Sequence, residues 1–184
     1  TRYYQEILDI LPLLRHLQAP SGFFPIRFER QSSYLRKSQD YHISNIRHWA
    51  VYDMIYPEWA DTKKLAHYFV GDFPSELHEN SGIVRDLDAE VSLWKKHWKT
   101  SHLQMTPFND DYFIYDNRDI HPKSKTHLIN KEQAQEIMRS VPYAESENLK
   151  WAVEEKLGVV VDSWYVPLVT AAPELLLEFE GQSF

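Results

Sequence analysis

The chain of 184 residues contains no cysteine, and this absence limits both how it can be stabilised and what it can catalyse. Without cysteine there is no disulfide, no thiolate ligand for zinc or an iron–sulfur cluster, and no thiol nucleophile. The length is enough to bury a real core and suits one domain or two small ones. Apolar residues make up 43% of the chain, close to the globular norm, which argues against disorder.

Charge constrains the partners of the chain. The formal net charge is −7, which argues against general binding to a phosphate backbone. The charge is uneven: residues 1–50 hold seven Arg or Lys against four Asp or Glu, whereas residues 145–180 hold two against eight. Such asymmetry either orients a partner or marks two solvated faces. No apolar run reaches the roughly 18–20 residues of a membrane span, and no signal-peptide pattern opens the chain. We therefore expect a cytoplasmic protein with neither nucleic acid nor a membrane as partner.

The spacing of apolar residues and the positions of proline predict helices and strands in the first hundred residues. The pattern predicts a helix that Pro12 ends, a short strand or extended segment over residues 13–18, and another strand within residues 23–30. Three further helices are expected. They cover residues 46–56, residues 61–71 with Asp61 or Thr62 as N-cap and Gly71 as the stop, and residues 83–97.

The sequence changes character near residue 105. A β-rich run covers residues 112–119, and two helices follow, capped by Asn130 and by Ser146, the second stopped by Gly158. A hairpin is expected about a turn at Asp162 and Ser163. The order strand, helix, helix, hairpin suits a winged-helix arrangement. The predicted fold class is therefore α+β, with a helical subdomain followed by a small winged-helix-like subdomain that holds a short antiparallel sheet.

The motifs of several enzyme classes are missing. The nine histidines form no His-x-His or His-x-x-x-His pair, so we expect no metal site. There is no Gly-x-Ser-x-Gly elbow for a hydrolase and no glycine-rich loop for phosphate. We therefore expect no catalytic residue within this chain.

Arginines beside aromatic residues are the strongest binding signal. Three arginines, Arg27, Arg30 and Arg36, lie among Phe24, Phe28 and Tyr34, where guanidinium groups suit an anionic ligand or the backbone of a larger substrate, or form a basic surface loop. Arg118 lies at the end of the β-rich run and suits a bidentate pair with a carboxylate, either of the protein or of a ligand.

These residues lie in motifs that resemble a known family. The segments HLQAPSG with PIRFERQSSY, then IRHWAVYDMIYP, LAHYFVG, IYDNRD and VDSWYVPLV occur in the order of the C-terminal third of the cobalamin-dependent radical S-adenosylmethionine maturases of ribosomal peptides, the C-methyltransferases. The resemblance covers nearly the whole chain. Ala19 stands where the family usually has proline, and Gln31 and Ser33 stand where it usually has phenylalanine and proline.

The resemblance implies that this chain is one part of a longer enzyme with several domains. Residues 1–35 would end a partial barrel and link it to a helical subdomain over 36–104 and a winged-helix-like subdomain over 105–184. The chain starts at Thr1 inside an expected helix, so the barrel and cobalamin domains would precede it. The parent enzyme would use S-adenosylmethionine, a four-iron four-sulfur cluster and cobalamin, and this chain alone would bind none of them and be inactive.

The same resemblance implies that the chain holds a peptide substrate and covers the active site. The substrate-binding residues would be Gln18, Ser21, Arg27, Arg30, Tyr34 and Arg118. Deleting residues 105–184 should then impair peptide binding. The alternative is a non-catalytic module that binds a peptide or a protein.

Two further expectations concern the folding of the chain and the place of the peptide. Removed from a barrel, the chain should fold poorly, because apolar side chains would stay exposed at Leu8, Leu11, Leu14 and Leu17. If residues 112–119 and the hairpin of 159–169 form one sheet, its outer strand could pair with an extended peptide. A merely solvated sheet edge is the alternative.

Overall fold

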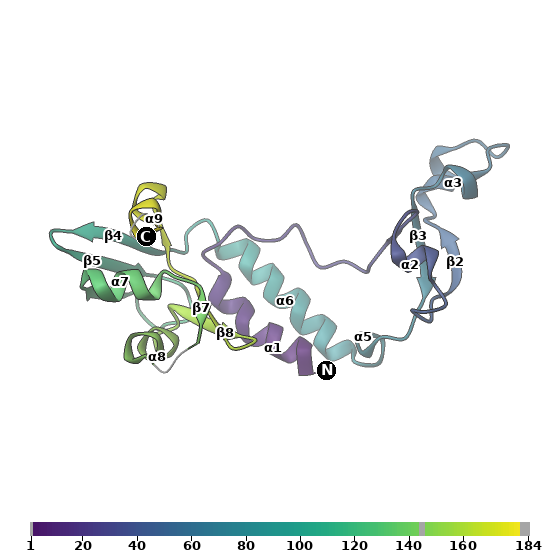
Figure 1. Ribbon diagram of the computed structural model, residues 1–184. Coiled ribbons are helices and arrows are strands. Elements are labelled where there is room, and N and C mark those ends of the chain that lie inside the picture. The colour runs from purple at the N-terminus through teal and green to yellow at the C-terminus, as the bar shows by residue number, and fades with distance from the viewer. Residues whose placement is uncertain (1, 144–145, 181–184) are drawn as a thin grey trace. The chain divides into compact units, whose positions relative to one another are not determined.

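The computed structural model describes residues 2–143 and 146–180 and divides them between two compact units. Unit 1 is Phe23–Arg85, and unit 2 combines Arg2–Gly22 with Asp86–Phe184. Helices and three small, mainly antiparallel sheets make up the two units, so the α+β class is confirmed (Figure 1). The boundaries between the units lie at residues 22 and 85, not at 35 and 104, because residues 2–22 pack with the C-terminal part of the chain.

Unit 1 is built on a three-stranded antiparallel sheet of order β1-β3-β2. Four buried side chains form its core: Phe28, Ile43, Ala66 and Phe69. Its elements are β1 (Phe28–Glu29), α2 (Ser33–Arg36), β2 (Ser44–His48), α3 (Val51–Ile55), α4 (Thr62–Leu65), β3 (Tyr68–Asp72), α5 (Glu76–Glu79) and the start of α6 (Ser81–His97).

The sequence overestimated the helical content of unit 1. The helix expected over 46–56 is shorter, because its first residues belong to β2 and only Val51–Ile55 are helical. Asp61 caps α4 as expected, but the run after Leu65 is strand β3. The cause is tertiary pairing, because Phe69 of β3 lies opposite Phe28 and His48 at once.

Gly71 therefore does not stop a helix. It lies in β3, where a Cβ atom would come within 2.8 Å of the Ile43 side chain and 2.9 Å of the Ser44 carbonyl oxygen. Glycine at this position allows β3 to approach the start of β2 closely.

Unit 2 holds two sheets and most of the buried core. One sheet has the order β10-β4-β5-β6, with β10 parallel to β4, and the other has the order β7-β9-β8. Its elements are α1 (Arg2–Ile10), η1 (Leu11–Leu14), the rest of α6, β4 (Leu103–Phe108), β5 (Asp111–Asp116), β6 (Lys125–Ile129), α7 (Lys131–Ile137), β7 (Val141–Pro142), α8 (Glu147–Glu154), β8 (Gly158–Val161), β9 (Trp164–Pro167), β10 (Thr170–Ala171) and α9 (Pro173–Glu180).

Local signals predicted the helices of unit 2 well. α6 covers the expected residues, Asn130 forms a capping box with Gln133 at the start of α7, and Ser146 caps α8. The hairpin is also confirmed: both Asp162 and Ser163 have positive φ, as a tight two-residue turn requires.

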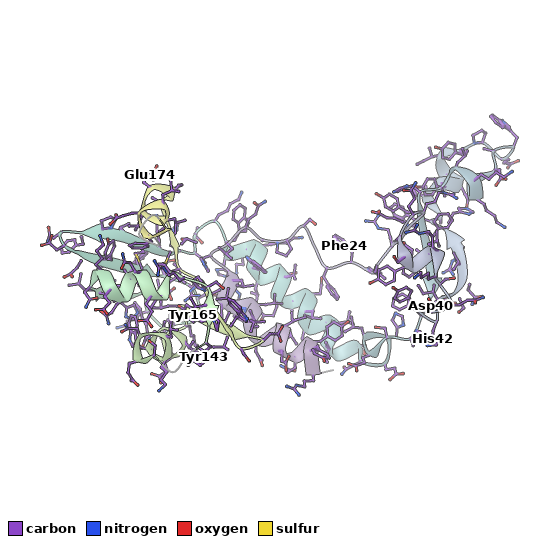
Figure 2. All side chains as sticks on the ribbon, in the orientation of Figure 1. Phe24, Asp40, His42, Tyr143, Tyr165 and Glu174 are labelled. Carbon is purple, nitrogen blue, oxygen red and sulfur yellow. The ribbon has the colours of Figure 1, made fainter. Side chains whose placement is uncertain are left out.

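Gly158 does not end α8. The helix stops at Glu154, and Lys156 takes the left-handed conformation with φ of 62°. Gly158 instead begins β8, where an added methyl group would overlap the ring of Tyr165. The Tyr165 hydroxyl donates to the Ile137 carbonyl oxygen at 3.0 Å, so this ring is fixed in the core (Figure 2).

The sheet expected from residues 112–119 and the hairpin does not form. β5 is paired on both sides, by β4 and β6, whereas the hairpin strands β8 and β9 belong to the other sheet. An added peptide strand cannot use β5, because its backbone groups are already paired. The expected winged-helix arrangement stays a prediction.

The N-terminal segment also differs from expectation. α1 ends at Ile10, two residues before Pro12, and residues 11–14, which include Pro12, form a 3₁₀ turn; no strand begins at residue 13. Leu14 packs against the core of unit 2, whereas Leu17 is 37% exposed.

Candidate functional site

The outer face of the unit 1 sheet carries an exposed group of arginine and aromatic side chains. The pleat of the strands turns Phe28 and Phe69 toward the core, so the neighbouring Arg27 and Tyr68 point the other way. The Arg27 guanidinium lies 4.6 Å from the ring centre of Trp49 and 5.6 Å from that of Tyr68. We call this surface the outer face; its residues are Arg27, Glu29, Arg47, Trp49, Tyr68, Val70 and Asp72.

The two arginines of the outer face are engaged differently. Arg47 donates to the Asn45 carbonyl oxygen at 3.2 Å and lies 3.8 Å from an Asp72 carboxylate oxygen. Arg27 has its two ring contacts, but among the described residues no carboxylate or carbonyl oxygen accepts from its guanidinium. Arg27 is therefore an ordered cation whose N–H donors remain available.

Arg30 and Tyr34 belong to the opposite, core side of the sheet. Arg30 lies over the Phe69 ring, with its guanidinium carbon 5.0 Å from the ring centre. Its Nε donates to the Ala66 carbonyl oxygen at 2.7 Å and its Nη2 to that of Lys63 at 2.5 Å, so its guanidinium closes the end of α4.

Tyr34 lies between two aromatic neighbours, with its ring tilted by 44° and 57° against theirs. Its ring centre lies 6.0 Å from that of Phe28 and 4.8 Å from that of Tyr41, and 44% of the residue remains exposed. Of the three arginine and tyrosine positions proposed in this unit, Arg27 is the one on the outer face.

The other three predicted residues belong to unit 2. Gln18 and Ser21 are exposed on the segment that leaves η1. Arg118 is 1% exposed. The six residues expected to hold a peptide are thus shared between the two units.

Arg118 takes part in a buried structural network. Its Nε and Nη2 donate to the two carboxylate oxygens of Asp116 at 2.9 and 2.6 Å. Its remaining bonds go to the carbonyl oxygens of Leu13, at 2.7 Å, and Lys156, at 2.8 Å. The bidentate partner is thus a carboxylate of the protein. Arg118 ties η1, the end of β5 and the end of α8 together.

Asp116 stays ionised because of this partner. Burial alone raises the pKa of Asp116, but the hydrogen bonds and the positive charge of Arg118 outweigh burial, so the pKa lies below its usual value. The nearby Arg15 forms a second set of ion pairs, with Glu90 at 2.6 Å and Asp119 at 2.5 Å.

Two histidines near this network escaped the sequence analysis. His121 Nε2 lies 3.3 Å from an Asp116 carboxylate oxygen, and His127 Nε2 lies 3.8 Å from Glu155. Burial lowers the pKa of both imidazoles. His121 lies in the loop between β5 and β6, and His127 lies in β6 near Glu155 at the end of α8, so the spacing of these residues along the chain carries no signal of their contacts. Within residues 2–143 and 146–180, no group of three or more His, Asp or Glu side chains is arranged to hold a metal ion.

A histidine and carboxylate pair in unit 1 does not form a catalytic triad. His48 Nε2 lies 2.7 Å from Asp53 Oδ1 and 3.4 Å from the Thr62 hydroxyl oxygen. A triad needs the acid and the nucleophile on different ring nitrogens, and here both approach the same one. This arrangement cannot relay a proton from the hydroxyl.

Comparisons of the chain with protein-family models, with curated proteins and with solved structures gave no match. Among the helices of the described residues, none is long and apolar enough to cross a membrane. The outer face of unit 1 is therefore the candidate site on its own geometry: an exposed, ordered cation between two aromatic rings, suited to binding and without groups placed for covalent chemistry.

Proposed function

We propose that this chain is the C-terminal, substrate-holding region of a cobalamin-dependent radical S-adenosylmethionine enzyme that C-methylates a ribosomally made peptide. The five motifs in family order support the enzyme class. The outer face of unit 1 supports the peptide-holding role, and the ordered, unpaired Arg27 is the observation that carries it.

The physical case for peptide binding rests on rigid, amphipathic contact area. Trp49 is 38% exposed, and its ring is already held in place by Arg27. Aromatic and arginine side chains dominate binding energy at interfaces because they bury a large area at a low cost in side-chain entropy. An extended peptide crossing the outer face would bury both rings.

The cofactors of such an enzyme would be held outside this chain. An iron–sulfur cluster needs cysteine thiolates, and the chain has none. The cluster, S-adenosylmethionine and cobalamin would supply the methyl-transfer chemistry, and this chain would bind and orient the peptide. We further propose that the enzyme is cytoplasmic and contacts neither nucleic acid nor a membrane.

A non-catalytic protein-binding module is the second candidate. It is favoured by the unusually exposed apolar side chains of unit 1, among them Met54 at 85%, Ile55 at 67% and Trp59 at 87%. Exposed apolar side chains that lie together on one segment mark a surface that binds another protein, whereas single exposed apolar side chains are common on any protein surface.

The coding sequence before Thr1 separates the two candidates. The enzyme proposal expects a Cys-x-x-x-Cys-x-x-Cys run that reads continuously into Thr1. A complete natural chain without such a run would contradict the enzyme proposal and favour the binding module.

Kinetics of the natural-length enzyme test the holding role. Trp49→Ala should raise the KM for the peptide by about three- to tenfold, because the variant loses one aromatic contact with the bound peptide. The rate at which S-adenosylmethionine is cleaved in the absence of peptide should stay unchanged. Trp164→Ala is the matched control, because Trp164 is 49% exposed in unit 2 and shows neither a ring contact nor a cation contact among the described residues. An unchanged KM in the Trp49 variant would refute the holding role of the outer face.

A further inference from the structure

We infer that Arg27 receives a carboxylate group of the bound peptide, so that unit 1 selects an acidic segment flanked by apolar residues. This inference rests on the proposed peptide-holding function and adds the chemical class that the outer face recognises. It is argued from the state of one guanidinium group and from the side chains beside it.

The guanidinium of Arg27 is oriented before any ligand arrives. The rings of Trp49 and Tyr68 contact it at 4.6 and 5.6 Å. Ring contacts engage the face of the planar group and leave the N–H bonds along its edge free to donate. That edge matches the two oxygens of a carboxylate in a bidentate pair.

Arg30, a second arginine of unit 1 that lies over an aromatic ring, differs from Arg27 because its N–H groups already have acceptors. Arg30 also lies over a ring, but its Nε and Nη2 both donate to carbonyl oxygens of α4 and the residue after it. Arg27 has the ring contacts without the acceptors. Since ordering a long side chain costs conformational entropy, an arginine that is ordered and still unpaired binds an anion at a reduced cost.

The acidic side chains close by leave this cation unneutralised. Glu29 lies two residues after Arg27 and is exposed, yet no ion pair within 4.0 Å joins the two. Asp72 is the carboxylate nearest to Arg47, at 3.8 Å. The outer face is balanced in charge, with Arg27 and Arg47 against Glu29 and Asp72, so an anionic partner is favoured by the unpaired donors of Arg27 and not by net charge.

Apolar side chains lead up to the cation. Phe24 is 65% exposed and Ile26 is 46% exposed, on the extended segment that enters β1 (Figure 2). Residues two apart in an extended chain point to the same side. Phe24 and Ile26 therefore share the side of Phe28, opposite to Arg27. The apolar contact area beside the Arg27 donors comes from the rings of Trp49 and Tyr68.

Calorimetric titration of the natural-length protein, its folding checked by circular dichroism, with two matched peptides tests the inference. The probe is the acetylated, amidated octapeptide Gly-Phe-Glu-Leu-Gly-Glu-Phe-Gly, and its twin has glutamine in place of both glutamates. The acidic peptide should bind about fivefold more tightly than its twin, the upper range for one exposed ion pair.

Substitutions assign the preference to one side chain. Arg27→Gln should abolish the preference, and Arg27→Lys should reduce it, because an ammonium group keeps the charge and lacks the planar fork. Arg36→Gln is the matched control and should keep the full preference, because Arg36 is an exposed arginine of the same unit without a ring or carboxylate contact among the described residues.

The outcomes separate this inference from the proposed function. Equal binding of the two peptides, or a preference that survives Arg27→Gln, overturns the carboxylate assignment and leaves peptide holding intact. Failure of both peptides to bind overturns both. Inorganic phosphate and acetate are then compared as competitors of the acidic peptide. If phosphate displaces the peptide at a lower concentration than acetate does, Arg27 belongs to a phosphate site, and the assignment to a peptide carboxylate is overturned.

Discussion

Arg118 should be essential for the stability of unit 2, and the structure allows the cost of its loss to be worked out. Arg118→Met removes the two bonds to Asp116 and those to the carbonyl oxygens of Leu13 and Lys156. Asp116 would remain as a charge that is 1% exposed and has lost its main partner. Removing one member of a buried ion pair costs about 3–5 kcal/mol, a large share of the roughly 5–15 kcal/mol that stabilises a domain.

The double variant Asp116→Leu/Arg118→Met separates the charge effect from the packing effect. It removes the uncompensated charge and leaves the carbonyl oxygens of Leu13 and Lys156 without their donor. We expect it to lose about 1–3 kcal/mol, less than the single Arg118 variant.

Urea unfolding followed by circular dichroism measures these differences. A loss below about 1 kcal/mol for Arg118→Met would refute the reasoning, because that is the range of an exposed ion pair. Weaker peptide binding with an unchanged unfolding transition would instead identify Arg118 as a substrate-contacting residue.

Two other predictions concern the core of unit 2. Gly158→Ala should destabilise the chain by about 1–3 kcal/mol, because the new methyl group overlaps the fixed ring of Tyr165; an unchanged thermal midpoint would contradict this packing. Stability should also fall as the pH drops below about 6.5, because burial lowers the pKa of His16, His121 and His127 in the folded chain. The unfolded chain then binds protons first, and each histidine contributes up to about 1.4 kcal/mol per pH unit until its folded pKa is passed. A flat urea midpoint between pH 7.5 and 5.5 would contradict the burial of these imidazoles.

Local signals explain what the sequence predicted correctly. Asp61, Asn130 and Ser146 cap helices by accepting from backbone N–H groups three residues away, so a short window contains the whole interaction. The turn at Asp162 and Ser163 is local in the same sense.

Pairing between distant segments explains the errors. The run after Leu65 has apolar residues compatible with a helix, and its pairing with β1 and β2 makes it a strand. Such pairing depends on residues about 20 to 40 positions away, which no periodicity reports.

The candidate site follows the same rule. The sequence placed Arg27, Arg30 and Tyr34 together as one group, but the pleat of the sheet separates Arg27 from the other two. Arg118 pairs with the neighbouring Asp116, but the bonds that bury it go to Leu13 and Lys156, which are far away in sequence. The residue types therefore indicated where binding groups occur, and the fold decided which of them remain free.

The most direct test of peptide holding is fluorine NMR of the chain labelled with 5-fluorotryptophan at its six tryptophans. The Trp49→Phe variant assigns the Trp49 signal. On addition of the acidic octapeptide, we expect this signal to shift in a saturable way, while that of Trp151, which packs against the core of unit 2, stays unchanged. A titration in which Trp49 does not move and a tryptophan of unit 2 does would place the peptide elsewhere and contradict the assignment of the outer face as the peptide-holding surface.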